Sequence, residues 1–154
     1  MVFARPVDTL FPIKAQYGDR SARYEWSIDR DIGLWIPIQY QGAGDHNGID
    51  FDCPIGTIVR AMSDGMIVRS RYENYLASDD GAGLFILQIV TLLGYDSWVL
   101  KYSHIKASYV KPGQAIKRGE AIAESGMSGN AISPYLHVDL MNLHRQWQPI
   151  PIEN

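Results

Sequence analysis

Short apolar runs and alternating polar and apolar positions recur along this chain, and both patterns predict β-strands. Two β-branched runs, Thr57–Met62 and Met66–Ser70, flank the turn sequence Ser63-Asp-Gly65, which predicts a tight hairpin. Leu84–Thr91 and Ser97–Tyr102 form a second predicted strand pair. Because no segment of a dozen residues combines helical periodicity with capping residues, we expect a mostly β fold with little helix.

The segments outside these pairs are less regular. Phe11-Pro-Ile13 predicts a strand start and Tyr17-Gly-Asp-Arg20 a turn, whereas Ser21–Gly44, rich in charged and aromatic residues, predicts a long ordered connection. The polar segment Tyr72–Gly83 is predicted to be a loop. The last residues, Asn142–Asn154, are polar with two prolines and predict a surface strap.

One internal repeat follows the second strand pair. Lys111–Ile116 and Lys117–Ile122 are successive six-residue units, each with a glycine turn and a short apolar pair. The repeat superficially resembles biotinyl and lipoyl carrier domains, but the turn Ser63-Asp-Gly65 lacks the lysine that such domains carry, so that interpretation is set aside. Lys101–Arg118 holds five basic residues and no acidic one, which favours a solvated edge over attraction for an anionic polymer.

Length and composition narrow the function classes. A chain of 154 residues predicts a single domain, 1–154, with its core at about 11–141. With 14 Lys and Arg against 17 Asp and Glu, the net charge of -3 argues against a nucleic-acid binder. The single cysteine, Cys53, excludes disulfides within the chain and multi-cysteine metal sites, and we expect it to be a small core residue.

The sequence shows no recognisable targeting segment. Nowhere do eighteen apolar residues run together, so no membrane-spanning helix is expected. The N-terminus has neither a basic start nor an apolar run of signal-peptide length. A cytoplasmic protein, a phage-borne protein and a mature protein with a trimmed leader all fit this observation.

With only four histidines and one cysteine, any metal chemistry must use histidines and a carboxylate. Two motifs contain such residues. His46-Asn-Gly-Ile-Asp50 places an imidazole and a carboxylate where a loop enters a strand. In Tyr135–Leu140, residues Tyr135, His137 and Asp139 point to one face of the predicted strand, and the apolar residues between them to the other. A polar row opposite an apolar row is typical of a strand that floors a cleft. Taken alone, the strand is better explained as a solvent-facing strand with a single stray histidine.

The order and spacing of several motifs resembles the LytM/lysostaphin-type (M23) zinc metallopeptidases, which cut peptide bonds in bacterial peptidoglycan. The resemblance covers about residues 11–141 and implies a LytM-like, duplicated-hybrid-motif-type domain whose antiparallel sheets form a groove. The matching segments are Tyr17–Arg20, His46–Asp50, Gly56–Gly65, Tyr102-Ser-His104, Val110–Ile122, Ser125–Gly129 and Pro134–His137.

The resemblance implies three metal ligands, His46, Asp50 and His137. Two imidazoles and one carboxylate would bind one Zn²⁺ and leave the fourth position to water, the pattern of a catalytic zinc. His104 matches one of the family's two catalytic histidines and would act as base and then as acid. Where the family has its second catalytic histidine, this chain has Tyr135, whose hydroxyl would stabilise an oxyanion.

The departure at Tyr135 leaves two functions open. The first is a zinc endopeptidase that cuts peptidoglycan cross-links or stem peptides, acting outside the cytoplasm as a monomer, with specificity set by Ser21–Gly44 and Tyr72–Gly83. The second is a catalytically silent LytM-like module that binds cell wall or activates a partner hydrolase. Asp139 would hold the free ring nitrogen of His137 in either case, or be a plain surface acid.

Three other residues receive no catalytic role. His144 lies in the tail, matches no family motif and is expected to be solvated. Asp45 is expected to be a loop acid. Cys53 has no basic residue nearby in the sequence that would make it a nucleophile.

Overall fold

The computed structural model describes residues 2–19, 24–29, 34–39, 46–73, 81–129, 131–144 and 146–153, the segments 24–29 and 34–39 by their backbone alone. Every regular element in these residues is a strand, so the expected mostly β fold is confirmed. Nothing in the described residues forms a helix of the length and apolarity that crossing a membrane requires. The strands are β1 Ile13–Ala15, β2 Tyr24–Asp29, β3 Leu34–Gln39, β4 Gly48–Phe51, β5 Ile58–Arg60, β6 Gly65–Glu73, β7 Gly83–Val90, β8 Val99–Ser108, β9 Ala115–Ile116, β10 Ala121–Ser125, β11 Leu136–Met141 and β12 Trp147–Gln148.

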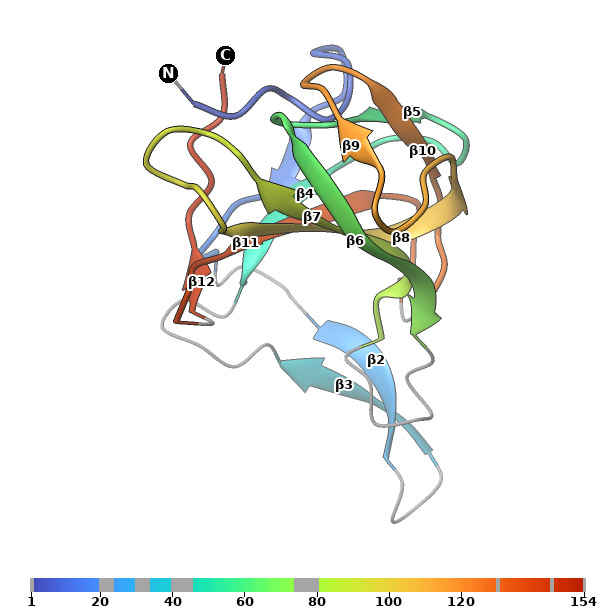
Figure 1. The fold of residues 1–154 in the computed structure, drawn as a ribbon. Helices are drawn as coiled ribbons and strands as arrows, with labels where there is room; N and C mark the ends of the chain where they lie inside the picture. Colours follow the sequence, from blue (N-terminus) through green and yellow to red (C-terminus); the bar gives the residue numbers. More distant parts are fainter. Residues whose placement is uncertain are drawn as a thin grey trace.

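One large antiparallel sheet organises the fold (Figure 1). Its strands follow the order β1-β4-β11-β8-β7-β6-β9, while β10 pairs with both β5 and β8, and β12 pairs with β11. Strands β2 and β3 form a separate two-stranded sheet. Strands β6, β7 and β8 are consecutive in both sequence and sheet, whereas β4 and β11, which flank the candidate site, are neighbours in the sheet but far apart in sequence.

The hairpin expected between residues 57 and 70 is wrong. Strand β5 pairs with β10, and β6 pairs with β7 and β9, so the two β-branched runs have different partners. The residues of the expected turn bind other segments instead. The Asp64 carboxylate accepts a hydrogen bond from the Arg118 backbone N–H at 2.8 Å. The buried Gln88 side chain donates to the Ser63 carbonyl at 2.9 Å. These hydrogen bonds hold the segment between β5 and β6 against other parts of the fold, so this segment does not form a two-residue turn.

The long connection expected over Ser21–Gly44 is also wrong, because β2 and β3 pair from Tyr24↔Gln39 to Asp29↔Leu34. The signal was present in the sequence: apolar Tyr24 and Trp26 alternate with polar neighbours, the period of a strand. The charged residues of this segment obscured that period. The second strand pair is confirmed, since β7 pairs with β8 throughout. Most of the expected loop at 72–83 lies outside the described residues.

The core lies on one face of the large sheet. Leu136, Val138 and Leu140 of β11 are fully buried in it, together with side chains of β4, β7 and β8. Cys53 is buried there as expected. The C-terminal strap is attached more firmly than a surface segment, because Ile150 joins the core and Ile152 bridges to Phe3.

The six-residue repeat is confirmed as two glycine turns that lead into β9 and β10. Gly113 and Gly119 take φ angles of +88° and +84°, which glycine adopts without strain. The solvated edge expected over Lys101–Arg118 holds only in part. Lys106 is exposed, but Lys101 is buried against the Phe85 ring, with its ammonium 4.7 Å from the ring centroid.

A crossing of two glycine backbones supports the middle of β8, at His104. Gly83 (φ +66°) and Gly129 (φ +74°) approach so closely that a Cβ on either would overlap the other's backbone. The neighbours of these glycines bind His104: the Ala82 carbonyl accepts from its backbone N–H at 2.8 Å, and the Ser128 carbonyl lies 2.8 Å from its Nδ1. The crossing therefore sets the position of the His104 ring.

Replacing one glycine of this crossing should lower the free energy of unfolding by more than the loss of a glycine with a positive φ angle alone explains. Gly113→Ala is the matched control, because Gly113 also has a positive φ but has open space around it. We expect Gly113→Ala to lower the free energy of unfolding by about 1–2 kcal/mol. Gly83→Ala should lower it by about 2 kcal/mol more, because the backbone of residues 128–129 must move. Urea denaturation measures both, and equal losses would show that the crossing is not constrained.

Candidate metal centre and active site

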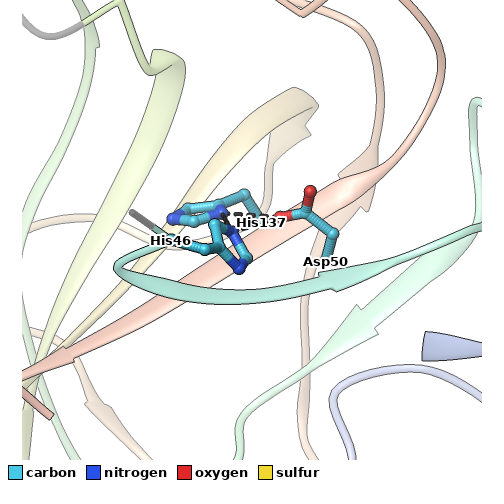
Figure 2. A group of neighbouring side chains, drawn as sticks. All are labelled: His46, Asp50 and His137. Atoms are coloured by element: carbon cyan, nitrogen blue, oxygen red, sulfur yellow. Dashed lines mark hydrogen bonds and ion pairs between the residues drawn. The ribbon is translucent and has the colours of Figure 1, made fainter. Parts of the chain in front are cut away.

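Three potential ligands converge between β4 and β11 (Figure 2). Asp50 lies in β4 directly opposite His137 of β11, and His46 lies just before β4. His46 Nε2 is 3.3 Å from His137 Nδ1 and 3.2 Å from Asp50 Oδ1. His137 Nδ1 is 2.7 Å from the same Asp50 oxygen. All three side chains are buried, and their donor atoms lie within 4.8 Å of one another.

Gly48, which lies between His46 and Asp50, permits this arrangement. A Cβ on Gly48 would overlap the Val138 carbonyl and come within 3.0 Å of Asp139 Cβ. Only glycine therefore lets β4 pair this closely with β11. The pairing continues from Leu136↔Phe51 to Asp139↔Gly48, so it fixes the register that sets Asp50 beside His137.

Hydrogen bonds outside the cluster orient both imidazoles. His46 Nδ1 lies 2.8 Å from the Gln16 carbonyl, which can only accept, so Nδ1 carries the proton and Nε2 presents its lone pair to the cluster. His137 Nε2 lies 3.4 Å from Asp139 Oδ2 on the opposite side of its ring. The structure thus places Asp139 at the free nitrogen of His137, where the sequence suggested it.

The cluster has an excess of negative charge that a cation must balance. Burial alone would lower the pKa of His137, but its hydrogen bonds to the Asp139 and Asp50 carboxylates outweigh that effect and raise the pKa to about 10. The remaining Asp139 oxygen, Oδ1, is buried with no hydrogen-bond partner among the described residues. A proton on His137 or a metal ion between the three ligands supplies the positive charge.

The candidate ligands fit Zn²⁺ in type, and two of their three separations fit it in spacing. Bonds of about 2.0–2.1 Å in a tetrahedron place neighbouring ligand atoms about 3.3 Å apart. The two separations from His46 Nε2 match this value, while the 2.7 Å separation between His137 and Asp50 is that of a hydrogen bond. Three protein ligands leave one coordination position for water or substrate, as in catalytic zinc sites.

A histidine–tyrosine pair lies beside the cluster. His104 of β8 has a φ of +61°, a strained angle for a residue with a side chain. Its Nδ1 donates to the Ser128 carbonyl at 2.8 Å, so its Nε2 is the acceptor for the Tyr135 hydroxyl at 3.2 Å. The His104 and His137 ring centroids are 6.3 Å apart. Both predicted catalytic side chains are buried next to the predicted ligands.

The residues without an assigned role also have clear positions. His144 is exposed, as expected. Burial raises the pKa of the Cys53 thiol, which disfavours the nucleophilic thiolate. Asp45 lies outside the described residues. His137 and Asp139 lie on the polar row of β11 as predicted, and Tyr135 directly precedes the strand, but all three residues are buried.

Sequence reasoning missed Lys14 near the site. Its ammonium is 2.9 Å from Ser133 Oγ and 5.2 Å from the centroid of the Tyr135 ring. No sequence motif marks this lysine, because the contact depends on the pairing of β1 with β4.

Comparison with known proteins identifies the family of this chain. The chain is 34% identical over 96 residues to the peptidoglycan DD-endopeptidase ShyA of Vibrio cholerae, covering 62% of the chain and 20% of that relative. It is 37% identical over 105 residues to the glycyl-glycine endopeptidase ALE-1 of Staphylococcus capitis, covering 68% of the chain and 26% of that relative. The chain therefore spans about a fifth to a quarter of the length of these relatives.

A solved structure matches nearly the whole chain. The catalytic domain of the antimicrobial peptidase lysostaphin from Staphylococcus simulans superposes with a TM-score of 0.68 at 27% identity, covering 91% of this chain and 89% of that domain. The family model of peptidase family M23 matches residues 44–149, a range that contains every candidate ligand and both candidate catalytic residues. On this match, the chain belongs to peptidase family M23.

Proposed function

We propose that this chain is a zinc-dependent endopeptidase that hydrolyses peptide bonds in bacterial peptidoglycan, at cross-links or in stem peptides. The observation that carries the proposal is the convergence of His46, Asp50 and His137 beside the His104–Tyr135 pair. The names of the relatives support it, because they are endopeptidases and one is named for peptidoglycan. Such an enzyme acts outside the cytoplasm, on the cell wall.

In this proposal, His46, Asp50 and His137 hold the zinc ion. When bound, zinc polarises the scissile carbonyl and lowers the pKa of a coordinated water molecule. Asp139 accepts a hydrogen bond from the Nε2–H group of His137, which would keep Nδ1 directed at the metal. The Gln16 carbonyl does the same for His46.

His104 transfers protons. Its Nδ1 proton is committed to the Ser128 carbonyl, so its Nε2 can accept a proton from the attacking water. The resulting imidazolium then gives that proton to the leaving amine. The glycine crossing and the strained backbone hold this ring near the ligands, which limits its motion during both transfers.

Tyr135 stabilises the developing negative charge on the carbonyl oxygen. Its hydroxyl donates to His104 Nε2 in the free enzyme. Once substrate is bound and His104 Nε2 has accepted the proton of the attacking water, Nε2 can no longer accept a hydrogen bond from Tyr135. The Tyr135 hydroxyl is then available to donate to the oxyanion. Phenol has an ordinary pKa of about 10 and is a poor base at neutral pH, so Tyr135 does not replace His104 as the proton acceptor.

The presence of Tyr135 at a catalytic position also favours a second function, a silent module that binds cell wall or activates a partner hydrolase. Peptide release from purified cell walls separates the two functions. The endopeptidase releases new amino termini and loses activity with a metal chelator. A protein that binds walls but releases no peptide from any wall type supports the silent module.

Removing one ligand should abolish zinc binding and peptide release together. We expect the protein to hold one zinc ion per chain and His137→Ala to hold almost none, because two ligands rarely retain the metal. The control is His144→Ala, which changes an exposed histidine outside the cluster and should alter neither quantity. Elemental analysis and wall digestion measure the two. Full zinc content in His137→Ala would exclude this ligand assignment.

Replacing Asp139 should weaken metal affinity without removing a ligand. Asp139→Asn keeps the shape of the side chain but loses the charge facing His137 Nε2, so we expect zinc affinity to fall about 10- to 100-fold. Competition with a chromophoric chelator measures the affinity. Asp96→Asn, at an exposed acid, is the control. Equal affinities for the two variants would make Asp139 a structural residue only.

Removing the Tyr135 hydroxyl should slow turnover while leaving zinc bound. We expect Tyr135→Phe to lower kcat about 100-fold, as for other lost oxyanion donors, with unchanged zinc content. Tyr109→Phe, at an exposed tyrosine after β8, is the control and should keep full kcat. If Tyr135→Phe turns over as fast as the parent enzyme, the hydroxyl does not stabilise the oxyanion.

A further inference from the structure

We propose that Lys14 forms a carboxylate-binding subsite beside the scissile bond, so that the enzyme prefers peptides with an acidic residue next to the bond it cuts. The inference rests on the proposed peptidase function and deepens it by naming a substrate class. It starts from a residue that no motif marks, at the edge strand β1 of the large sheet.

An irregularity in β1 directs Lys14 toward the site. Ile13 pairs with Phe51, and Ala15 pairs with the adjacent Asp50, so two steps along β1 match one step along β4. Lys14 is the extra residue of this β-bulge. Its neighbour Ala15 is buried, and Ile13 packs on the core, so the bulge is anchored on both sides. Bulges beside active sites commonly redirect a side chain in this way.

The contacts of the Lys14 ammonium fix its position next to Tyr135. It donates a hydrogen bond to Ser133 Oγ at 2.9 Å and lies 5.2 Å from the centroid of the Tyr135 ring. A cation over an aromatic face is held by the negative charge density of the ring. The same tyrosine binds His104 Nε2 through its hydroxyl. Lys14 is thus one side chain away from the proposed reacting groups.

The charge of Lys14 is available to a ligand. The residue is exposed, and no acidic side chain in the described part of the chain forms an ion pair with it. An ammonium has three donor protons, and Ser133 uses one. The carboxylates nearest the site, Asp50 and Asp139, are both directed at His137. The group that best completes this arrangement is an anionic oxygen of the bound substrate.

This subsite distinguishes two kinds of peptide bond. A glycyl-glycine bond, such as the one named for ALE-1, has no side chains and offers Lys14 no carboxylate within a glycine run. A peptide with a side-chain or terminal carboxylate next to the cut bond forms a charge-assisted hydrogen bond with the ammonium. The proposal therefore favours acidic peptides over glycine bridges.

Matched peptides test this preference. Zinc-loaded enzyme is assayed with internally quenched alanine–glycine peptides that carry a single Glu or Gln at each position near the cleaved bond. We expect kcat/KM for the Glu peptide to exceed that for the Gln peptide about five-fold at one position, an advantage of the size that a partly exposed ion pair gives. The advantage should lie mainly in KM and should shrink as salt rises.

Three variants assign the preference to Lys14. Lys14→Met removes the charge but keeps the chain length, and should bring the Glu-to-Gln ratio to about one. Lys14→Arg should restore the ratio, because the charge returns. Lys111→Met, at an exposed lysine of the repeat, should leave it unchanged. An unaltered ratio in Lys14→Met, or a wild-type ratio of one at every position, overturns the inference while leaving the peptidase proposal intact.

A binding measurement tests the subsite even if no peptide is cut. Zinc-loaded protein is titrated with N-acetylalanine and with N-acetylalaninamide, and the amide NMR signals of Lys14 and Ser133 are followed. We expect the carboxylate to shift both signals, the neutral amide to shift neither, and Lys14→Met to abolish the shift at Ser133. Equal shifts with the two compounds, or none with either, overturn the inference independently of activity.

Discussion

The pairing of β4 with β11 is the constraint on which the site depends. Gly48 has no Cβ, so the two backbones approach closely enough for a continuous ladder from Phe51 to Gly48. That ladder sets Asp50 opposite His137, and the loop before β4 adds His46. A one-residue slip would turn His137 to the other face of the sheet, where Leu136 and Val138 lie in the core. The core packing of β11 and the geometry of the ligands are therefore one constraint.

The buried charges explain why the cluster combines carboxylates with a histidine. Asp50 and Asp139 both face His137, and burial makes unbalanced negative charge costly. In the absence of metal, a proton on His137 balances this charge and holds the ring in place between the two carboxylates. In the proposed enzyme, a divalent ion between His46, Asp50 and His137 would take over that role. This arrangement would keep the proposed ligands in position before a metal binds, which reduces the reorganisation that binding requires.

Backbone strain is concentrated where the proposed proton transfer takes place. His104 adopts a positive φ in the middle of β8, and the crossing of Gly83 with Gly129 supports it through two hydrogen bonds to neighbouring carbonyls. Such strain persists only where the surrounding structure over-determines it. Tyr135 completes this group and links it to Lys14, so the histidine, the tyrosine and the lysine form one connected set beside the ligands.

The sequence by itself determined the strand-rich fold, the second strand pair and the three residues that converge in the His46–Asp50–His137 cluster. Strands can be predicted from local sequence because their polar and apolar residues alternate with a period of two. The motifs around His46 and His137 can be recognised from the spacing of their residues along the chain. Only the tertiary structure decided the partners of the other strands. The β-branched run around Val59 joined β10 rather than its neighbour in sequence, because Ser63 and Asp64 bond to distant segments. It also decided that Lys14 faces Tyr135, since a bulge arises only when two strands meet in a given register.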